Sequence, residues 1–462
     1  MSGITDSIYQ ISPPWLQNLL ISAYGYQLYR KRYTGLYHDI RRSIDAAKIL
    51  TRDELEAYQA ERLHQMVKYC RGSIPYYQKL LADWGLSEQD FTHTRDLTKL
   101  PVLDKQTIRK RANELRNPEI RPYMVQHTSG STGTPLVLNV DEYTYKLAMA
   151  LVVDHEEQHG VRFGARRATF AGRMIQPVEN MNPPFSRYNR AENQRLFSSY
   201  HINNSNFPHY QRELDRFAPE EIIGYPSAIY DIASQYHHFG VAPQFRPKVV
   251  ITNSETLMDW QRTRIETVFN CPVRDYYGTA EYVLFSGQCS KGMYHLNPVI
   301  GMVETVDTED RPVTDTAGEI LATSLTNKAM PLLRYRIGDT AILGSKRCAC
   351  DSDLPYFRQI LGRTDDVILT EDGKRIGRID HIFKGLSGIQ EAQVIQERLN
   401  RCRIKVVTAQ PGVAIDEALL KQNLLTRTGQ SMQVDIEYTR AIERGANGKF
   451  KGVVSLVGDT QR

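Results

Sequence analysis

Apolar residues recur at helical spacing through the first hundred residues and at strand spacing further along the chain. Amphipathic helices are predicted over Arg52–Arg71 and Ser87–Leu97, where the apolar positions follow the period of an α-helix. From residue 123 onward, short apolar runs alternate with helical patterns, as where Leu136–Val140 precedes Glu142–Gln158. Further strands of this kind are expected at Val249–Thr252, Val273–Tyr276 and Glu319–Thr323. The alternation predicts an α/β architecture.

The pattern changes in two places. Residues 180–207 are polar, rich in Asn and interrupted by Pro183 and Pro184, which predicts a long loop or lid. After Gly362, a helix predicted over Asp416–Leu425 lies among three strand candidates, Ala392–Gln396, Ile404–Ala409 and Gln433–Tyr438. We therefore expect a boundary between Gly362 and Asp366. It separates a large multi-layer α/β domain (residues 1–363, helical over 1–100) from a small α+β domain (residues 364–462).

The composition is that of a globular protein. Of 462 residues, 41% are hydrophobic and 24% are charged, which excludes a disordered or fibrous chain. The 58 basic and 53 acidic residues leave a net charge of +5, which is too small an excess to indicate a nucleic-acid partner but suits a local pocket for an anionic ligand. Tyrosine is abundant, with 26 residues, and it serves core, surface and ligand sites alike.

The N-terminal part predicts a cytoplasmic protein without a transmembrane segment. It lacks the features of a secretory signal, and the six Cys do not form a disulfide framework in a chain of this length. Its most apolar stretch, Trp15–Tyr26, is too short and too polar to span a bilayer. Tyr29–Tyr33, with Arg41 and Arg42, is basic and interleaved with Tyr. This stretch suits a solvated helix face, and also contact with a membrane surface, RNA or a partner.

A loop rich in glycine and hydroxyl side chains precedes the strand at Leu136. Glycines let the backbone approach an anion closely, and consecutive N–H groups with hydroxyls surround phosphate oxygens. The segment lacks the Gly-Lys-Ser/Thr ending of a Walker A loop, and alone it also suits a Ser/Gly-rich turn. Its candidate phosphate ligands are Thr128, Ser129, Gly130, Ser131, Thr132 and Gly133.

Four further segments follow in order: Tyr277–Glu281, Tyr335–Asp339, Gly362–Asp366 and Asn447–Lys451. With these segments, the sequence resembles the AMP-forming adenylate ligases, the superfamily of acyl-CoA synthetases, peptide-synthetase adenylation domains and luciferases. Within that superfamily it is most similar to the phenylacetate–CoA ligase branch, especially the ligase-like proteins associated with capsular polysaccharide genes. Any one segment is a weak signal, whereas all of them in the family's order are a strong one.

The resemblance implies a nucleotide site. Thr128–Gly133 match the loop that holds the ATP triphosphate, Tyr277 matches the aromatic that stacks on adenine, and Glu281 matches the catalytic carboxylate that coordinates Mg²⁺. Asp339 matches the acid that binds the ribose hydroxyls, and Arg363 the arginine near ribose and phosphate. Further residues implied around the nucleotide and the acyl pocket are Ser254, Glu255, Gly278, Thr279, Tyr225 and Ser227. A tight turn explains the segment at Tyr225 equally well.

The resemblance also implies a small domain that moves. Asp365 falls on the family's hinge position, and Lys449 matches the catalytic lysine that reaches the reacting carboxylate and the α-phosphate. An exposed turn lysine is the alternative for Lys449, and Lys451 is a nearby competitor for the same role.

The chain departs from the family pattern in two positions. Ala280 stands where the family usually has Thr or Ser, so a hydroxyl contact to the phosphate is missing or comes from Thr279. The phosphate loop ends in Thr134-Pro135-Leu136, without the Lys that many relatives carry. Surface or salt-bridged acids remain the alternative explanation for Glu281 and Asp339.

Four residues form a candidate metal site outside these segments. Cys348 and Cys350 form a C-x-C pair, and Cys289 and His295 lie upstream. Three thiolates and one imidazole are a tetrahedral set that Zn²⁺ accepts, although the spacing is not that of a common zinc finger. Ordinary reduced cysteines and a core histidine are the alternative. A similar pattern in the phenylacetate-ligase branch implies a structural zinc, without a role in acyl transfer.

The function implied is ATP-dependent activation of a carboxylic acid. The acid attacks the α-phosphate of Mg·ATP, which gives an acyl-adenylate and pyrophosphate, and coenzyme A then accepts the acyl group as a thioester. An amine acceptor, which would give an amide, is the main variant. A non-catalytic ligase-fold protein of a polymer-assembly complex is the rival, favoured by Ala280. The branch would also suit a homodimer, while the motifs leave the acid itself open.

Overall fold

The computed structural model describes residues 9–127, 136–363, 368–371, 375–376, 382–383, 386, 388–408, 413–444 and 450–457. Two units are distinguished, each of which is described by itself. The large unit comprises Met1–Ile337 and Ile342–Gln359, and the small unit comprises Gly338–Ala341 and Ile360–Arg462. The domain boundary that we place between residues 363 and 364 remains a prediction.

Helices dominate the first part of the described chain, as the apolar spacing predicts. Their bounds are α2 (Pro14–Tyr33), α3 (Tyr37–Lys48), α4 (Arg52–Ser73), α5 (Pro75–Asp83) and α6 (Lys105–Leu115). The predicted helix over Ser87–Leu97 is instead two short 3₁₀ helices, η1 (Glu88–Asp90) and η2 (Thr94–Lys99). The carboxylates of Asp90 and Asp96 accept the backbone N–H groups of Ser87 and His93, each at 2.8 Å. Such local bonds compete with the continuous hydrogen bonding of an α-helix. None of the described helices is both long enough and apolar enough to cross a membrane.

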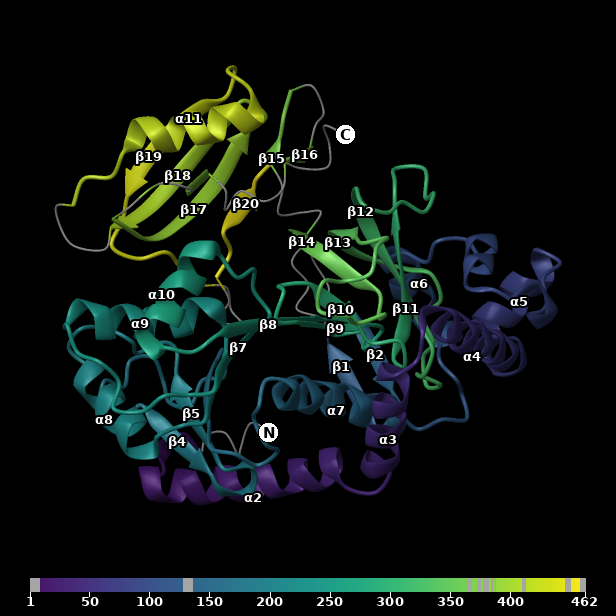
Figure 1. Cartoon of the computed structure of the whole chain (residues 1–462), viewed down its shortest axis with the longest axis horizontal. Coiled ribbons are helices and arrows are strands. Elements are labelled where there is room, and N and C mark those ends of the chain that lie inside the picture. The colour runs from purple at the N-terminus through teal and green to yellow at the C-terminus, as the bar shows by residue number, and fades with distance from the viewer. Residues whose placement is uncertain are drawn as a thin grey trace. The chain divides into compact units, whose positions relative to one another are not determined.

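A twelve-stranded sheet organises the large unit (Figure 1). Its order is β11-β12-β13-β14-β10-β9-β8-β7-β6-β3-β5-β4, and the neighbours β8, β7, β6, β3 and β5 run parallel. The strands are β3 (Arg167–Ala171), β4 (Ser186–Asn189), β5 (Gln194–Ser198), β6 (Glu221–Gly224), β7 (Val249–Asn253), β8 (Val273–Gly278), β9 (Phe285–Gln288), β10 (Tyr294–Leu296), β11 (Gly301–Val306), β12 (Ala317–Ser324), β13 (Tyr335–Leu343) and β14 (Tyr356–Arg363). The predicted strands at residues 249, 273 and 319 are all present.

Helices cover both faces of the parallel strands. On one face lie α8 (Phe207–Phe217), α9 (Pro226–His238) and α10 (Asp259–Phe269), and on the other lies α7 (Glu142–Gln158) (Figure 1). Successive strand residues point to opposite faces. Ile222 and Val250 accordingly belong to the apolar cluster shared with α8, α9 and α10, whereas Ile223 packs in a second cluster with Val249 and Ile251. Burial on both faces explains why these strands read as continuous apolar runs.

The prediction of a loop over residues 180–207 is wrong in part. The segment contains β4 and β5, joined by the 3₁₀ helix η3 (Arg190–Glu192), and β4 pairs antiparallel with β5 at the edge of the sheet. Polar groups on α2 hold β4 in place: the Asn18 side chain accepts the backbone N–H of Tyr188 at 2.9 Å. Because these partners are more than a hundred residues away in sequence, the local pattern carries no sign of them.

Two paired strands outside the large sheet flank the predicted phosphate loop in the sequence. They are β1 (Met124–His127) and β2 (Val137–Val140), which pair antiparallel with His127 opposite Val137. The residues that connect them, 128–135, lie outside the described residues.

The small unit has its own four-stranded sheet, with the order β19-β18-β17-β20. Its core unites apolar residues of β17, β18 and the helix α11, among them Val394, Ile404 and Leu420. The elements are β15 (Ile368–Leu369), β16 (Arg375–Ile376), β17 (Ile389–Arg398), β18 (Arg401–Thr408), α11 (Glu417–Thr428), β19 (Gln433–Tyr438) and β20 (Val453–Ser455). The predicted fold class, a large α/β part followed by a small α+β part, is confirmed.

Candidate nucleotide site and metal centre

Glu281 is held by a phenol from a distant strand. It lies within a turn after β8, in which the Tyr282 N–H donates to the Thr279 carbonyl at 3.1 Å. Its carboxylate is buried, with 7% of the residue exposed, and accepts a 2.7 Å hydrogen bond from the hydroxyl of Tyr335, which is itself fully buried. A carboxylate has about four lone-pair sites, so one phenol orients it and leaves capacity for a cation. The sequence prediction did not assign a role to Tyr335.

Tyr277, Gly278 and Thr279 lie at the end of β8 and in the turn after it. The ring of Tyr277 packs edge-to-face against Phe357, with centroids 6.3 Å apart. The Thr279 Oγ1 atom is buried and has no hydrogen-bond partner among the described residues. A buried hydroxyl without a partner is costly, which makes it a natural donor or acceptor for a ligand. This hydroxyl stands next to Ala280, the position where this chain lacks the hydroxyl that the family pattern usually has.

A buried acid supports β8 two residues before Tyr277. The carboxylate of Asp275 accepts hydrogen bonds from Thr252 on β7, at 2.7 Å, and from Tyr294 on β10, at 2.9 Å. Burial raises the pKa of Asp275 to about 7, against the opposing effect of these hydrogen bonds. The group ties three strands together, and the sequence prediction missed it because its partners Thr252 and Tyr294 lie on other strands.

The structure brings together two segments that the resemblance associates with adenine and the acyl pocket. Ser227 at the start of α9 donates to the carboxylate of Glu255 through its backbone N–H and its hydroxyl, each at 3.1 Å. Before it, Gly224 approaches Phe170 so closely that a Cβ would lie 1.7 Å from the Phe170 carbonyl oxygen. Burial raises the pKa of the Tyr225 phenol, and the Glu255 carboxylate adds to the rise. The neighbouring Ser254 has a positive φ of 69° and donates to the Asn253 side chain at 2.9 Å.

In the small unit, the two residues predicted to hold the ribose lie opposite each other. Asp339 belongs to β13 and Arg363 ends β14, and the Arg363 Nε lies 4.0 Å from the Asp339 carboxylate. Both side chains are partly exposed, so this pair contributes little to stability by itself. The geometry suits a carboxylate that accepts ribose hydroxyls while its charge is balanced by a guanidinium.

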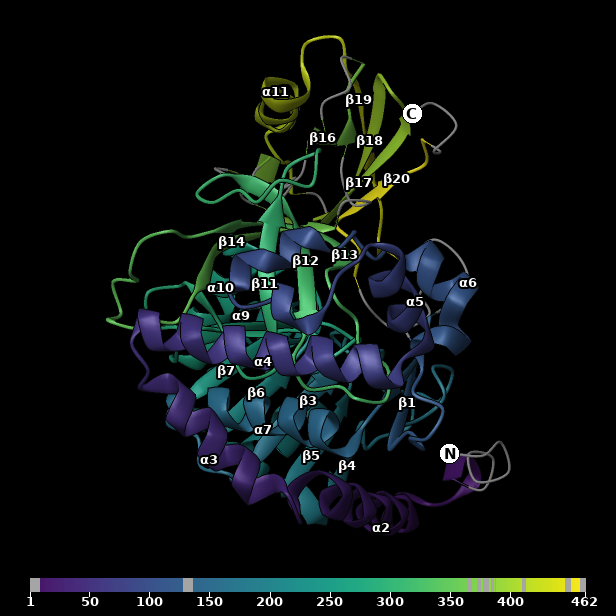
Figure 2. The same cartoon turned by 90° about the vertical axis from the view of Figure 1, so that its right-hand side faces the viewer.

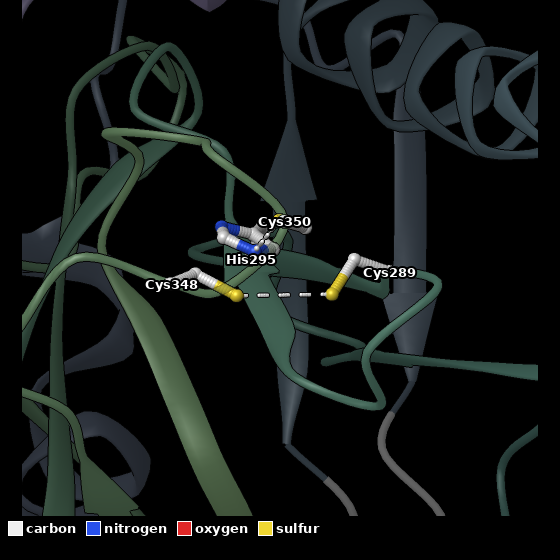
Figure 3. A group of neighbouring side chains, drawn as sticks. All are labelled: Cys289, His295, Cys348 and Cys350. Atoms are coloured by element: carbon white, nitrogen blue, oxygen red, sulfur yellow. Dashed lines mark hydrogen bonds between the residues drawn. The ribbon is translucent and has the colours of Figure 1, made fainter.

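The four predicted zinc ligands meet in the large unit (Figure 3). Cys289 follows β9, His295 lies on β10, and Cys348 and Cys350 lie between β13 and β14. Their ligand atoms all lie within 4.8 Å of one another. The sulfurs of Cys289 and Cys348 are 4.0 Å apart, and the Cys350 sulfur lies 3.2 Å from the His295 Nε2.

These distances suit a tetrahedral zinc. Zn–S bonds of about 2.3 Å at tetrahedral angles place two sulfurs about 3.8 Å apart. The His295 Nδ1 lies 3.3 Å from the Leu354 carbonyl, which fixes the ring and leaves Nε2 facing the cysteines. The set is closed, because all four ligands come from the protein.

The remaining predicted site residues cannot be placed. Thr128, Ser129, Gly130, Ser131, Thr132 and Gly133 of the phosphate loop, the hinge residue Asp365 and the lysine Lys449 lie outside the described residues. Their roles remain predictions, as do those of Glu281, Asp339 and Arg363.

The fold is that of the AMP-forming CoA ligases. The crystal structure of 2-hydroxyisobutyryl-CoA ligase in the postadenylation state, in complex with R3-HIB-AMP, has a TM-score of 0.69 with this chain and 18% sequence identity, covering 87% of this chain and 89% of that one. The anthranilate CoA ligase AuaEII in complex with anthranoyl-AMP has a TM-score of 0.51 and 14% identity, covering 87% of this chain and 80% of that one.

Sequence comparison finds further relatives of the chain. Protein CapK of Staphylococcus aureus is 27% identical over 464 residues, which cover 97% of this chain and 99% of CapK. The phenylacetate-coenzyme A ligase of Thermus thermophilus is 25% identical over 329 residues, which cover 69% of this chain and 73% of the ligase. The family model of the CapK C-terminal domain matches residues 368–455. The chain is therefore a homologue of CapK and of the phenylacetate–CoA ligases, and the resemblance predicted from its sequence is confirmed.

Proposed function

We propose that this protein activates a carboxylic acid with ATP and transfers the acyl group from the adenylate to coenzyme A. Its homology to phenylacetate–CoA ligases and its fold support this class of reaction. The similarity to CapK along nearly the whole chain makes an acid of polysaccharide metabolism a candidate beside aromatic acids. The proposed setting is the cytoplasm, where ATP and coenzyme A are available.

The observation that carries the proposal is the buried Glu281 carboxylate, oriented by Tyr335. A carboxylate in this position suits Mg²⁺, which usually takes one or two protein carboxylates and completes its shell with water and substrate phosphates. The bound cation would offset charge on the phosphate oxygens. The buried Thr279 hydroxyl, which has no partner in the part of the chain that the structure describes, supports the same proposal, because it offers a hydrogen bond to a phosphate oxygen that Ala280 cannot make.

The chain's own residues would then act by binding and orientation. Tyr277 supplies an aromatic face for adenine, and Asp339 with Arg363 binds ribose and balances charge. Lys449 is proposed to bring a cation to the reacting carboxylate and the α-phosphate. Alignment of two bound reactants accounts for a large share of catalysis in such a reaction, since no covalent enzyme intermediate is needed.

The Cys289, His295, Cys348 and Cys350 group is proposed to hold a structural zinc. The closed ligand set supports a structural role, because a catalytic zinc keeps one position open. The metal would connect the segment between β13 and β14 to strands β9 and β10, which continue into β8 and its turn.

A product assay tests the proposal. The protein is incubated with Mg·ATP, coenzyme A and, in parallel, aromatic, fatty, amino and sugar acids, and products are identified by mass spectrometry. We expect AMP, pyrophosphate and an acyl-CoA thioester with at least one acid. If an added amine gives an amide and no thioester forms, the acceptor is an amine and not coenzyme A. Absence of AMP with every acid would favour the non-catalytic alternative.

A further inference from the structure

Helix α2 packs against the rest of the large unit with Ile21, Tyr33 and several polar residues, and it leaves other large apolar side chains in solvent. Gln17 bonds to the guanidinium of Arg187, Asn18 accepts from Tyr188, and Ser22 accepts the backbone N–H of Arg190 at 3.0 Å. At Gly25, a Cβ would overlap the side chain of Asn189, so this turn of the helix lies directly on β4. A surface helix of a water-soluble domain usually presents polar side chains on its outward face.

The outward face of α2 carries large apolar side chains. Trp15 is 68% exposed, Leu19 is 60% exposed and Tyr26 is 61% exposed. Their spacing of four and seven residues places them on one side of the helix, and Arg30 follows on the same side four residues later. Ile11, just before the helix, is also exposed. Single exposed apolar residues are common, but an aligned set of this size marks an interaction surface.

Another long helix of the same unit shows the usual pattern. The exposed positions of α4 include Glu54, Glu56, Glu61 and Lys68, and its apolar residues Leu55, Leu63 and Val67 are buried. Both helices lie at the outside of the large unit in Figure 2. The exposed apolar face is therefore a property of α2 and not of the peripheral helices in general.

The charge around this face is positive. Residues 9–36 contain no Asp or Glu. Arg30 is exposed at the end of the apolar face, and Arg173 and Arg190, from segments that contact α2, are exposed as well. Arg32 is paired with Glu192 at 3.2 Å, and Glu179 is an exposed acid in the segment after Arg173. Basic residues thus outnumber acids beside the apolar face.

A cavity adjoins the helix on its flank. It is small, about 80 Å³, and is lined by Tyr9, Gln10, Leu20, Ile21, Tyr24, Arg173 and Met174. The guanidinium of Arg173 lies 5.6 Å from the centre of the Tyr24 ring, and the Gln10 side-chain oxygen is buried without a partner among the described residues. A guanidinium and an amide beside apolar walls suit a phosphate headgroup with attached hydrocarbon.

We propose that α2 lies in the interface of an anionic lipid bilayer, with Trp15, Leu19 and Tyr26 toward the acyl chains and Arg30 and Arg173 at the headgroups. Tryptophan and tyrosine favour this depth of a bilayer, and basic residues are attracted to anionic lipids. At about 1.5 Å per residue, the face from Trp15 to Arg30 offers a contact about 22 Å long. A second copy of the chain is a poorer occupant, because a twofold contact through this face would bring its basic borders together.

Vesicle flotation of the full chain tests the proposal. Vesicles of phosphatidylcholine mixed with phosphatidylglycerol are compared with vesicles of phosphatidylcholine alone, and binding is expected to be stronger with the anionic lipid and to weaken with salt. The double variant Trp15→Glu, Leu19→Glu is expected to lower the partition coefficient at least about tenfold. Arg30→Gln is expected to lower it about fivefold at low salt. Trp84→Glu is the matched control, because Trp84 is also exposed, at 55%, but lies elsewhere, and it should bind like the unchanged chain.

A second readout reports on Trp15 directly. The sequence contains three Trp, so Trp84→Phe with Trp260→Phe leaves Trp15 as the sole tryptophan, whose emission should shift to the blue with anionic vesicles. Failure of the unchanged chain to bind anionic vesicles would overturn the proposal, as would equal binding by the double variant. A dimer in light scattering that Trp15→Glu, Leu19→Glu converts to a monomer, without vesicle binding, would assign the face to a second copy instead.

Discussion

The large unit contains two groups suited to cations, and they are built on opposite principles. The Cys289, His295, Cys348 and Cys350 group supplies four soft ligands, all within 4.8 Å of one another. Glu281 supplies one hard carboxylate, which accepts a hydrogen bond from the phenol of Tyr335. The first group would satisfy a zinc ion completely, whereas the second would leave most of a magnesium shell to water and substrate.

The difference indicates what each site can contribute. A closed site binds its metal as part of folding, so its loss affects stability before chemistry. An open carboxylate contributes little to folding and gains its function when a phosphate ligand arrives with the cation. Variants of the two sites should therefore separate metal content from adenylation.

The largest effect is expected from Cys348→Ser. Because one of four zinc ligands is lost, zinc should fall from about one per chain to below about 0.2, with a lower melting temperature. Metal analysis by mass spectrometry and thermal unfolding measure both. Cys271→Ser is the control, since Cys271 is equally buried but lies outside the group, and it should keep the zinc. A purified, chelator-free protein that already lacks zinc would contradict the prediction.

Glu281→Gln should slow adenylation and leave zinc content and stability unchanged. We expect adenylation to slow about 100-fold, or about 2.7 kcal/mol, because the amide keeps the shape but removes the charge that attracts Mg²⁺. Zinc content and melting temperature should stay within error of the unchanged protein. If more than half the rate survives, Glu281 does not coordinate the catalytic cation.

Asp275→Asn should change the pH dependence of stability. The folded carboxyl has a pKa of about 7, above its ordinary value of about 4, so between these pH values the folded state holds a proton that the unfolded state has lost. Rising pH therefore destabilises the folded protein through this group, by at most about 1.4 kcal/mol per pH unit. Urea unfolding from pH 5 to 7 should show a shallower decline for the variant. A residual slope is expected from Glu156, whose pKa burial raises to about 8.

Tyr335→Phe should give the smallest effect. The variant loses one hydrogen bond that orients the Glu281 carboxylate, worth about 1 kcal/mol. If this energy is lost from the transition state, adenylation slows about fivefold. A raised magnesium requirement would identify the role as positioning of the carboxylate. The control is Tyr210→Phe, which removes an equally buried hydroxyl that donates to the Ser198 carbonyl instead. Equal rates in both variants would exclude a role for Tyr335 at this site.

Hydrophobic periodicity predicted those helices and strands whose bounds depend on neighbouring residues in the sequence. The bounds of α7 and β19 agree with the predicted Glu142–Gln158 and Gln433–Tyr438, since their periodicity and flanking residues are clear. The strand β4 was missed because its polar residues are satisfied by α2, far away in sequence. Sequence periodicity contains no information about such a partner.

The same distinction applies to the candidate sites. The Cys/His group was predicted from residue type, because few roles suit three cysteines and a histidine, although Cys289 and Cys348 are 59 residues apart. Tyr335 stood inside a recognised segment, but only contact with Glu281 reveals its role. Strand alternation offered one signal, since Tyr335 and Asp339 are four residues apart and share a face of β13.

Pyrophosphate exchange into ATP, measured without coenzyme A, tests the central claim most directly. With a panel of carboxylic acids, we predict acid-dependent exchange by the unchanged protein and about 100-fold less by Glu281→Gln at equal zinc content. Exchange with no acid, from a folded and zinc-loaded protein, would contradict the assignment as an adenylate-forming ligase.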